Sequence, residues 1–486
     1  MATKPLARFQ TSRPGGPIRP RAPFEQRRRA HGTLRNPAST LALETAEDMR
    51  FLHCADIHLG YQQYNNKERF NDFGRAFYAV IDEAIGRKVD FVILAGDLFH
   101  KRSIDALTLN QAIRGLERLR RAGIPCIAVE GNHERAYYDE TIGWMKFLAL
   151  QDLMILLDAE FVDSKPQLRV WDAAKRQGSY VDLPGGVRVH GLRYYGSGTV
   201  LAVAAYAEAM ALLPPGEAKY NIFVAHAGVE GQMDEKAGGL SPRQWSPLRP
   251  HVDYVALGHF HKPFEVDDWI YNPGSPENCS IAENDWQHRG YLVVDLNLAT
   301  ENKESVRHTV FQGRNRRRCF RLYPYKTDHI QSPAELHERL RSFLTRKATE
   351  LADEMAGKAA DILPPVIELY LTGVLPFERS ALDVPAIEAL LNECFQPAPL
   401  VAMVKNLTQP SEFAISPDVT LSRAALEQQV LTDLFGRDGR YAAHSSEWAA
   451  MTVNLKQLVL AGASASAVLD ELSAQVESID HADTAR

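Results

Sequence analysis

Asp, Asn and His side chains end five apolar segments of the chain. In chain order the endings are D-x-H, G-D, G-N-H, a single His and G-H-x-H, and they supply the candidate metal ligands Asp56, His58, Asp97, Asn132, His226, His259 and His261. Each motif alone is a weak signal, but all five in this order are rare by chance. Carboxylate and amide oxygens combined with imidazole nitrogens suit Mn, Fe or Zn better than magnesium or calcium alone.

This ligand set predicts a site for two divalent metal ions about 3.5–4 Å apart, with one carboxylate bridging them. Two such ions would lower the pKa of a shared water molecule and hold the attacking and leaving oxygens of a phosphoryl transfer. The negative charge of a phosphate ester needs that compensation. The ligand types therefore indicate phosphoryl chemistry.

Strands must bring these residues together, and the sequence indicates where they lie. Apolar runs within residues 49–60, 89–100 and 124–134 each end in candidate ligands, and helical patterns over residues 71–87 and 105–122 separate them. Strand, helix, strand, helix, strand predicts a parallel sheet that is buried on both faces. Binding groups in such sheets gather at the carboxyl ends of the strands, where all these polar residues lie.

A second set of strands is expected further along the chain. After a helix over residues 139–154 with Asp139 as its N-cap, strand-like pieces occupy residues 185–196, 220–228, 252–261, 269–280 and 290–297. We expect these pieces to form a second half-sheet. Two half-sheets that send their loops to one edge would form a sandwich with helices outside.

The flanking regions differ in composition from this central part. Residues 1–48 are rich in Arg and Pro and predict a disordered tail, with a DNA-contacting arm or an organellar transit segment as alternatives. Residues 301–410 alternate strand and helix patterns and predict a small α+β domain, and residues 411–486 predict amphipathic helices. Residues 327–486 hold 12 Lys and Arg against 23 Asp and Glu, a net charge of -11, whereas the rest of the chain carries +5.

Composition excludes several classes of protein. No apolar run is long enough to predict a membrane span. The five cysteines are scattered without a C-x-x-C pair, which favours reduced thiols in a cytosolic protein over a disulfide framework or a zinc knuckle.

The motifs D-I-H-L-G, G-D-L-F-H, G-N-H-E, V-A-H-A-G and G-H-F-H resemble those of the calcineurin-like metallophosphoesterase superfamily. Within it, they resemble the SbcD-type DNA repair exonucleases, over roughly residues 49–296. The resemblance implies an α/β fold, a four-layer β-sandwich flanked by helices, followed by a small α+β capping domain and a helical C-terminal region. It implies a metal-dependent double-strand exonuclease that is also an endonuclease on single strands or hairpins.

The resemblance also implies a role for each motif residue. Two ions, with Mn²⁺ expected, would be held by two sets that share Asp97 as the bridge: Asp56, His58, Asp97 and His261 in one, and Asp97, Asn132, His226 and His259 in the other. His133 would contact the scissile phosphate and assist departure of the leaving oxygen. His100 would help to place the DNA backbone. Glu134 departs from the family, because many of these nucleases carry Asp there, and we expect altered geometry rather than altered chemistry.

Partners follow from the same resemblance. It implies an SMC-like ABC ATPase bound through the C-terminal helices, with Leu434, Phe435 and Leu458 as candidate anchors, and the alternative is that these helices only close a core of their own. It also implies a homodimer formed near Trp144 and Phe147, and the alternative is that these two residues belong to the core. DNA would be bound mainly through its phosphates. The basic and aromatic run over residues 314–325 either grips that backbone or is an ordinary linker into a strand. A cytoplasmic, nucleoid-associated protein is expected.

Two other functions are compatible with the same candidate ligands. A small-molecule phosphodiesterase or phosphatase would use the same metals, although the sequence G-D-L-F-H-K-R differs from the G-D-x-V-D-R-G of protein phosphatases. A non-catalytic scaffold for an ATPase would have no need of His133. The remaining histidines His53, His190 and His288 are expected to be structural.

Overall fold

The computed structural model describes residues 48–134, 142–214, 218–233, 239–286, 289–298, 307–314, 318–356, 363–410, 422–436 and 440–484. The expected N-terminal tail, Asp139 and His288 lie outside these residues, apart from Asp48 at the end of the tail. Among the helices described, none is long and apolar enough to cross a membrane.

Three parallel strands form the centre of a six-stranded sheet, as predicted. β1 (Asp48–Cys54), β2 (Phe91–Ala95) and β3 (Cys126–Val129) lie side by side, with the short β4 (Ile155–Leu156) beyond β3. The helices α1 (Lys67–Gly86) and α2 (Ala106–Arg121) connect them. Helix α1 starts four residues before the predicted position because the side chain of Asn66 caps it, accepting the backbone N–H of Glu68.

One predicted strand belongs to a different sheet. β13 (Gly290–Asn297) was expected in the second half-sheet, but it pairs antiparallel with β1 in the first. β14 (Arg307–Arg314) continues the first sheet beyond β13, so these residues are not part of the small α+β domain expected from residue 301. The pattern could not assign the sheet because β13 is buried on both faces: Leu292 and Val294 face one core, and Tyr291 and Val293 face another.

The second sheet also has six strands, in the order β11-β12-β10-β9-β8-β7. Their bounds are β7 Tyr180–Leu183, β8 Val187–Leu192, β9 Tyr220–His226, β10 Tyr254–Gly258, β11 Phe264–Val266 and β12 Ile270–Asn272. β8, β9, β10 and β12 run parallel, and β7 and β11 are antiparallel edge strands. A small hairpin of β5 (Glu160–Val162) and β6 (Lys165–Gln167) lies outside both sheets.

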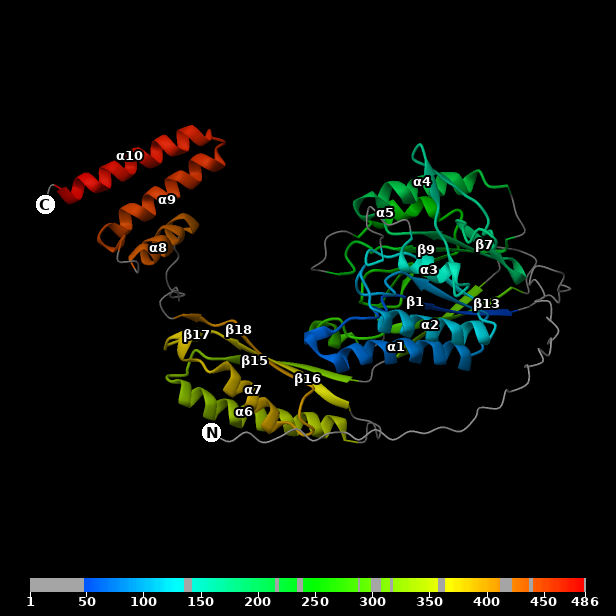
Figure 1. Ribbon diagram of the computed structural model, residues 1–486, viewed down its shortest axis with the longest axis horizontal. Helices are drawn as coiled ribbons and strands as arrows, with labels where there is room; N and C mark the ends of the chain where they lie inside the picture. The colour runs from blue at the N-terminus through cyan, green and yellow to red at the C-terminus, as the bar shows by residue number, and fades with distance from the viewer. Residues whose placement is uncertain are drawn as a thin grey trace, which may run out of the picture. The chain divides into compact units, whose positions relative to one another are not determined.

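Helices cover the outer faces of the two sheets, which gives four layers (Figure 1). α1, α2 and α3 (Trp144–Leu150) pack on the first sheet, and α4 (Thr199–Ala211) and α5 (Pro242–Trp245) pack on the second. Helix α3 begins at Trp144 after Gly143, later than the start predicted at residue 139, which lies outside the described residues. A separate apolar cluster fills the space between the sheets, and it includes Phe51, Ile93, Ile222 and Tyr254.

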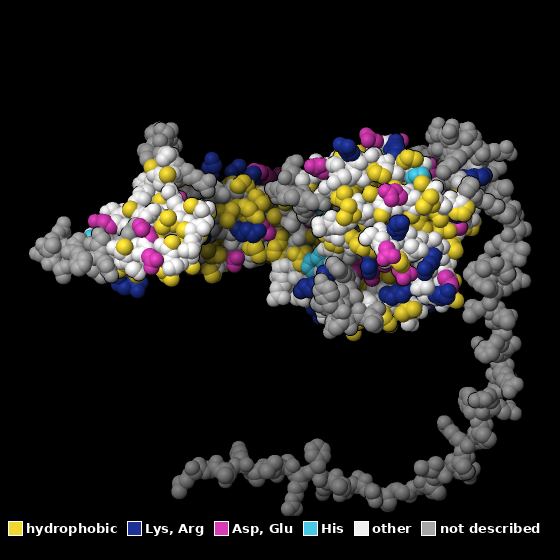
Figure 2. Space-filling model, turned by 90° about the horizontal axis from the view of Figure 1, so that it is seen from above, with side chains coloured by type: hydrophobic (Ala, Val, Ile, Leu, Met, Phe, Trp, Pro, Cys, Tyr) yellow, Lys and Arg dark blue, Asp and Glu magenta, His cyan; other side chains and the backbone are white. Residues whose placement is uncertain are grey.

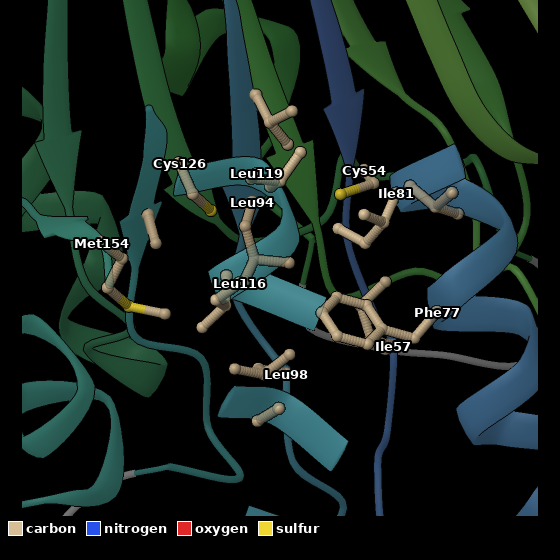
Figure 3. Close-up of a cluster of buried hydrophobic side chains, with 14 of the residues drawn as sticks. Cys54, Ile57, Phe77, Ile81, Leu94, Leu98, Leu116, Leu119, Cys126 and Met154 are labelled. Atoms are coloured by element: carbon tan, nitrogen blue, oxygen red, sulfur yellow. The ribbon is translucent and has the colours of Figure 1, made fainter. Parts of the chain in front are cut away.

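Figure 3 shows part of the core between the first sheet and its helices. Side chains from α1, α2 and three strands meet there, and those labelled include Phe77, Ile81, Leu116, Leu119, Cys54, Leu94 and Cys126. Each is at most 4% exposed. This close packing fixes the positions of the strands, and therefore the positions at which the following loops begin.

The small α+β segment begins at Arg318. β15 (Arg318–Lys326), β16 (Leu363–Thr372) and β18 (Val401–Asn406) form a parallel sheet, and β17 (Val374–Leu375) pairs with β19 (Gln409–Pro410). α6 (Pro333–Met355) and α7 (Val384–Cys394) pack on the sheet through leucines and isoleucines. The basic and aromatic run therefore includes an ordinary strand: from Arg318 onward it is β15.

The C-terminal region is helical, as predicted. It contains α8 (Arg423–Gly436), α9 (Ser445–Leu460) and α10 (Ala465–Thr484). The ring of Phe435 packs against Tyr441 and Trp448, with centroids 5.7 and 6.3 Å apart. Phe435 is thus part of the packing among these helices.

Charged side chains of both signs cover the surface. On the face shown in Figure 2, Lys and Arg side chains are interspersed with Asp and Glu side chains.

Candidate metal centre

The loops after five strands meet at one edge of the sandwich. They follow β1, β2 and β3 in the first sheet and β9 and β10 in the second. His226 is the last residue of β9, and the loops carry the other six candidate ligands. Backbone hydrogen bonds join the first two loops: Asp56 donates its N–H to the carbonyl oxygen of Gly96 at 3.1 Å, and His58 to that of Asp97 at 3.0 Å. Backbone hydrogen bonds therefore hold these two loops together without any contribution from side chains.

Asp97 lies between two groups of candidate ligands. Its Oδ2 atom is 3.2 Å from Nε2 of His226 and 3.9 Å from Nε2 of His58. Nε2 of His58 in turn lies 3.1 Å from Nε2 of His261. Carboxylate oxygens of Asp56 and Asp97 and a ring nitrogen of His226 all lie within 4.8 Å of one another. A bridging carboxylate needs a position of this kind.

Asn132 joins the second group. Its Oδ1 atom lies 3.1 Å from Nε2 of His226 and 3.0 Å from Nδ1 of His259. Nδ1 of His226 lies 2.8 Å from the carbonyl oxygen of Ala95, and because a carbonyl can only accept, this nitrogen carries the proton. The other nitrogen, Nε2, is thereby directed at Asp97 and Asn132. Backbone hydrogen bonds of this type commonly orient metal-binding imidazoles.

Several ligands have backbone angles that side chains rarely adopt. The φ angle is +54° at Asp56, +53° at His58, +53° at Asp97 and +90° at His259. Positive φ is uncommon for residues other than glycine and costs of order 1–3 kcal/mol in sparsely populated regions. Such conformations persist where the surrounding structure holds them, and they concentrate at functional sites.

Glycines let the loops approach the ligands closely. A Cβ atom on Gly131 would lie 2.1 Å from Oδ1 of Asp97, and one on Gly96 would lie 2.4 Å from Nδ1 of His226. Mixed oxygen and nitrogen donors converge in this space, with imidazole nitrogens only 3.1 Å apart. The donor set and the cradle therefore fit divalent metal ions.

The electrostatics favour a cation. Burial lowers the pKa of His226, but the carboxylate of Asp97 more than offsets this and raises it to about 9. Burial would raise the pKa of Asp97, whereas His226 lowers it. Asp56 and Asp97 are both almost completely buried, so their negative charge is concentrated away from solvent. Buried carboxylates of this kind need a compensating positive charge.

Three residues around the ligands could not be identified from the motifs. Glu283 accepts a hydrogen bond from Nδ1 of His261 at 2.8 Å, and Arg289 lies 2.9 Å from the same carboxylate. Burial would raise the pKa of Glu283, but these partners lower it to about 2. Cys279 also lies beside His261. The sequence signal nearest to these residues is Pro273-Gly274, a pair typical of sharp turns.

His133 and His100 lie next to the ligands. His133 donates its backbone N–H to Oδ1 of Asp97 at 3.1 Å, and its Nδ1 donates to the carbonyl oxygen of His100. Its Nε2 lies 3.8 Å from Oδ2 of Asp97, and its side chain is 32% exposed. The ring of His100 stacks on Tyr61 with centroids 3.8 Å apart. Burial and the neighbouring His133 lower the pKa of His100 to about 4, so its ring is neutral at physiological pH.

Residues 49–263 match the calcineurin-like phosphoesterase family. This part of the chain is a calcineurin-like phosphoesterase domain. The fold of such a phosphoesterase implies divalent metal ions.

Three archaeal relatives that match this domain share one name. The DNA double-strand break repair protein Mre11 of Archaeoglobus fulgidus is 32% identical over 245 residues, which are 48% of this chain and 52% of the relative. That of Haloferax volcanii is 28% identical over 326 residues, covering 66% of this chain and 64% of the relative. That of Methanosarcina mazei is 45% identical over 267 residues, covering 54% and 38%. The matches thus span roughly half the length of these relatives.

Two other histidines of the phosphoesterase domain are structural, as predicted. His53 is completely buried in β1, and its ring nitrogens lie 3.1 Å from the hydroxyl of Tyr254 and 3.0 Å from the carbonyl oxygen of Leu257. His190 is buried in β8, 3.3 Å from the hydroxyl of Tyr206.

A buried ionic network joins the phosphoesterase domain to β15. Asp72 of α1 lies 2.5 Å from Arg69 and 2.6 Å from Arg318. Arg69 also reaches Glu277 at 3.1 Å, and its guanidinium lies over the ring of Phe320, 4.8 Å from the centroid. Glu277 belongs to the same loop as Cys279, so the network is continuous with the surroundings of His261.

Proposed function

We propose that this chain is a metal-dependent DNA nuclease that acts in double-strand break repair. It would be an exonuclease on duplex ends and an endonuclease on single strands or hairpins. The observation that carries the proposal is the position of Asp97 between two ligand groups, with His133 held beside it. The Mre11 relatives of the phosphoesterase domain support DNA as the substrate.

The seven ligands would hold two divalent cations, Mn²⁺ in our proposal, in the two sets that share Asp97. Such ions supply Lewis-acid activation of water and neutralise charge on the phosphate. The surrounding protein keeps the ligands in place: Ala95 orients His226, and Glu283 orients His261. Because these contacts exist in advance, the site needs little reorganisation during the reaction.

His133 would act on the phosphate directly. Its Nδ1 atom is engaged with the carbonyl oxygen of His100, which fixes the ring and leaves Nε2 for the substrate. A proton on Nε2 can be donated to a phosphate oxygen or to the departing oxygen of the sugar. Its side chain is accessible, unlike those of Asp97 and His58, so a substrate can reach it.

The test is cleavage of end-labelled duplex and hairpin DNA by the full chain with Mn²⁺. We expect His133→Ala to keep its metal content, measured by elemental analysis, and to lose about 10²–10⁴-fold in rate. His251→Ala, a histidine outside the site, should cleave as the wild type does. Equal rates for wild type and His133→Ala would overturn the role of His133. Hydrolysis of bis-p-nitrophenyl phosphate without any DNA cleavage would favour a small-molecule phosphodiesterase.

We further propose that α8, α9 and α10 bind an SMC-like ABC ATPase. Apolar side chains on these helices remain exposed: Leu434, Val459, Leu460 and Leu469 are 48%, 59%, 76% and 61% exposed. Co-purification with such an ATPase should be lost in Leu460→Glu and retained in Leu201→Glu, which changes an exposed leucine of α4. Retention in both variants would exclude this surface.

Two further parts of the proposal concern assembly and location. A homodimer would form through α3, where Trp144 and Phe147 are partly buried against the domain core. Sedimentation of wild type and Trp144→Ala would show a dimer that dissociates in the variant, and a monomeric wild type would contradict it. As a DNA nuclease the protein would work in the cytoplasm at the nucleoid, which fluorescence microscopy of a tagged chain would test.

A further inference from the structure

A thiol lies beside two of the proposed metal ligands. Sγ of Cys279 and one ring nitrogen each of His58 and His261 all lie within 4.8 Å of one another. The facing nitrogens of the two imidazoles are 3.1 Å apart. His58 is 1% exposed, and its Nδ1 atom has no hydrogen-bond partner among the described residues. Two imidazoles and a thiol around one point are a donor set for a metal ion.

The backbone of Cys279 is fixed from both sides. Its N–H donates to Oε2 of Glu283 at 2.9 Å, and its carbonyl oxygen accepts from Nε2 of Gln63 at the same distance. Glu283 also accepts from His261, so one carboxylate positions both the thiol and the imidazole. The loop therefore places the sulfur before any ligand binds.

The thiol itself has only weak partners. Sγ lies 3.9 Å from the carbonyl oxygen of Glu277 and within 4.8 Å of a ring nitrogen of His261. A thiol is a weak hydrogen-bond donor, so these contacts are readily exchanged for a metal bond. No disulfide competes for the sulfur, because the cysteine is free.

We propose that Cys279 is an additional ligand, as a thiolate, of the metal ion that His58 and His261 would hold. This inference rests on the proposed metal-dependent function and specifies which metals that site prefers. On binding, the S–H bond breaks, the sulfur forms a bond to the metal, and the proton passes to solvent. A soft sulfur ligand favours Zn²⁺, Co²⁺ or Cd²⁺ over Mn²⁺ compared with oxygen and nitrogen ligands alone.

The simpler alternative is that Cys279 only orients His261 by hydrogen bonding. Removal of an outer partner typically costs about 10–100-fold in metal affinity, whichever metal is bound. Removal of a thiolate ligand should cost more, and selectively for thiophilic metals. Serine retains the hydrogen bond but is a poor ligand for Cd²⁺, so Cys279→Ser separates the two explanations.

The experiment is titration of the chelator-treated full chain with Co²⁺ or Cd²⁺, followed by ultraviolet absorption. A thiolate-to-metal charge-transfer band should grow in the wild type and in Cys394→Ser, a cysteine on α7 outside the site, and be absent from Cys279→Ser. The Cd²⁺ affinity of Cys279→Ser should fall more than about 100-fold, and its Mn²⁺ affinity much less. A wild type that binds two metals without the band, or a band that persists in Cys279→Ser, overturns the proposal.

A second measurement needs no variant. Bound Cd²⁺ should protect Cys279 of the native wild type from iodoacetamide, as measured by peptide mass spectrometry, and equal alkylation with and without Cd²⁺ contradicts the proposal.

Failure of the inference is distinct from failure of the proposed function. A chain that binds metals and cleaves DNA without a thiolate band loses only this inference, whereas a chain that binds no metal loses both.

Discussion

The carboxylate of Glu134 accepts a hydrogen bond from the backbone N–H of Asp97 at 3.1 Å. The same carboxylate accepts the N–H of Phe99 at 2.7 Å and that of Gly131 at 2.9 Å, and Glu134 is only 2% exposed. It therefore ties the loop that carries Asp97 to the loop that carries Asn132. Glu134 therefore positions the ligands through hydrogen bonds to the backbones of two loops.

Replacement of Glu134 should destabilise both loops. In Glu134→Ala three buried N–H groups lose their acceptor, and each unpaired group costs about 1–3 kcal/mol. We expect the free energy of unfolding to fall by about 3 kcal/mol or more, measured by denaturant titration. Glu134→Gln keeps the volume and one accepting oxygen and should lose less. An Ala variant within about 0.5 kcal/mol of wild type would contradict the role.

Glycine is required at position 131 by the approach of Asp97. The Cβ of Gly131→Ala would lie 2.1 Å from Oδ1 of Asp97, so the loop or the carboxylate has to move. We expect lower metal content and a loss of DNA cleavage, measured by elemental analysis and nuclease assay. Gly86→Ala, at the end of α1 with no atom near its Cβ, should leave both unchanged and should stabilise the helix slightly.

Asp72 compensates two buried arginines. Its side chain is 2% exposed, and Arg69 and Arg318 beside it are equally inaccessible. Asp72→Asn removes the charge and leaves both guanidinium groups buried without it, which typically costs 3–5 kcal/mol. We expect a loss of about that size in the free energy of unfolding. Combining Asp72→Asn with Arg318→Met should cost less than the sum of the single losses, because one change removes the partner of the other.

The contribution of Asp72 should depend on pH. Burial would raise the pKa of this carboxyl, but hydrogen bonds from Arg318 and the charge of Arg69 lower it below the ordinary value. Its stabilisation is then fully present above about pH 4, the unfolded value, and is lost as the pH falls through the folded pKa. The difference in stability between wild type and Asp72→Asn should shrink below pH 4, as denaturant titrations across pH 3–7 would show. A difference that stays constant would contradict this.

Metal removal should lower the melting temperature. Ions that bind only the folded chain stabilise it, by about 2.7 kcal/mol at a concentration one hundred times the Kd. We expect EDTA to lower the Tm and Mn²⁺ to restore it, in thermal unfolding followed by circular dichroism. His226→Asn should lose most of this response, while His251→Ala should retain it. An unchanged Tm in EDTA would indicate that the ligands hold no ion in solution.

Local patterns in the sequence determined the inner strands and the loops that follow them. β1, β2 and β3 are continuous apolar runs because they are buried on both faces. Parallel strands have their carboxyl ends at one edge of the sheet, so the polar residues that follow these runs were predicted to lie close together. The structure brings the side chains of Asp56, Asp97 and His226 to that edge. The helical pattern predicted over residues 105–122 also agrees with α2, whose N-cap Asp105 accepts the backbone N–H of Thr108.

Only the tertiary structure decided contacts between residues far apart in the chain. β13 is apolar on both faces and suits either sheet, and its pairing with β1 is a property of the assembled sandwich. The partnership of Asp72 with Arg318 and the place of Cys279 beside His58 have no local signature either. The period of a strand and the order of motifs can be recognised from a few neighbouring residues. These contacts instead depend on how separate segments pack, and that packing is determined by all the residues of the core together.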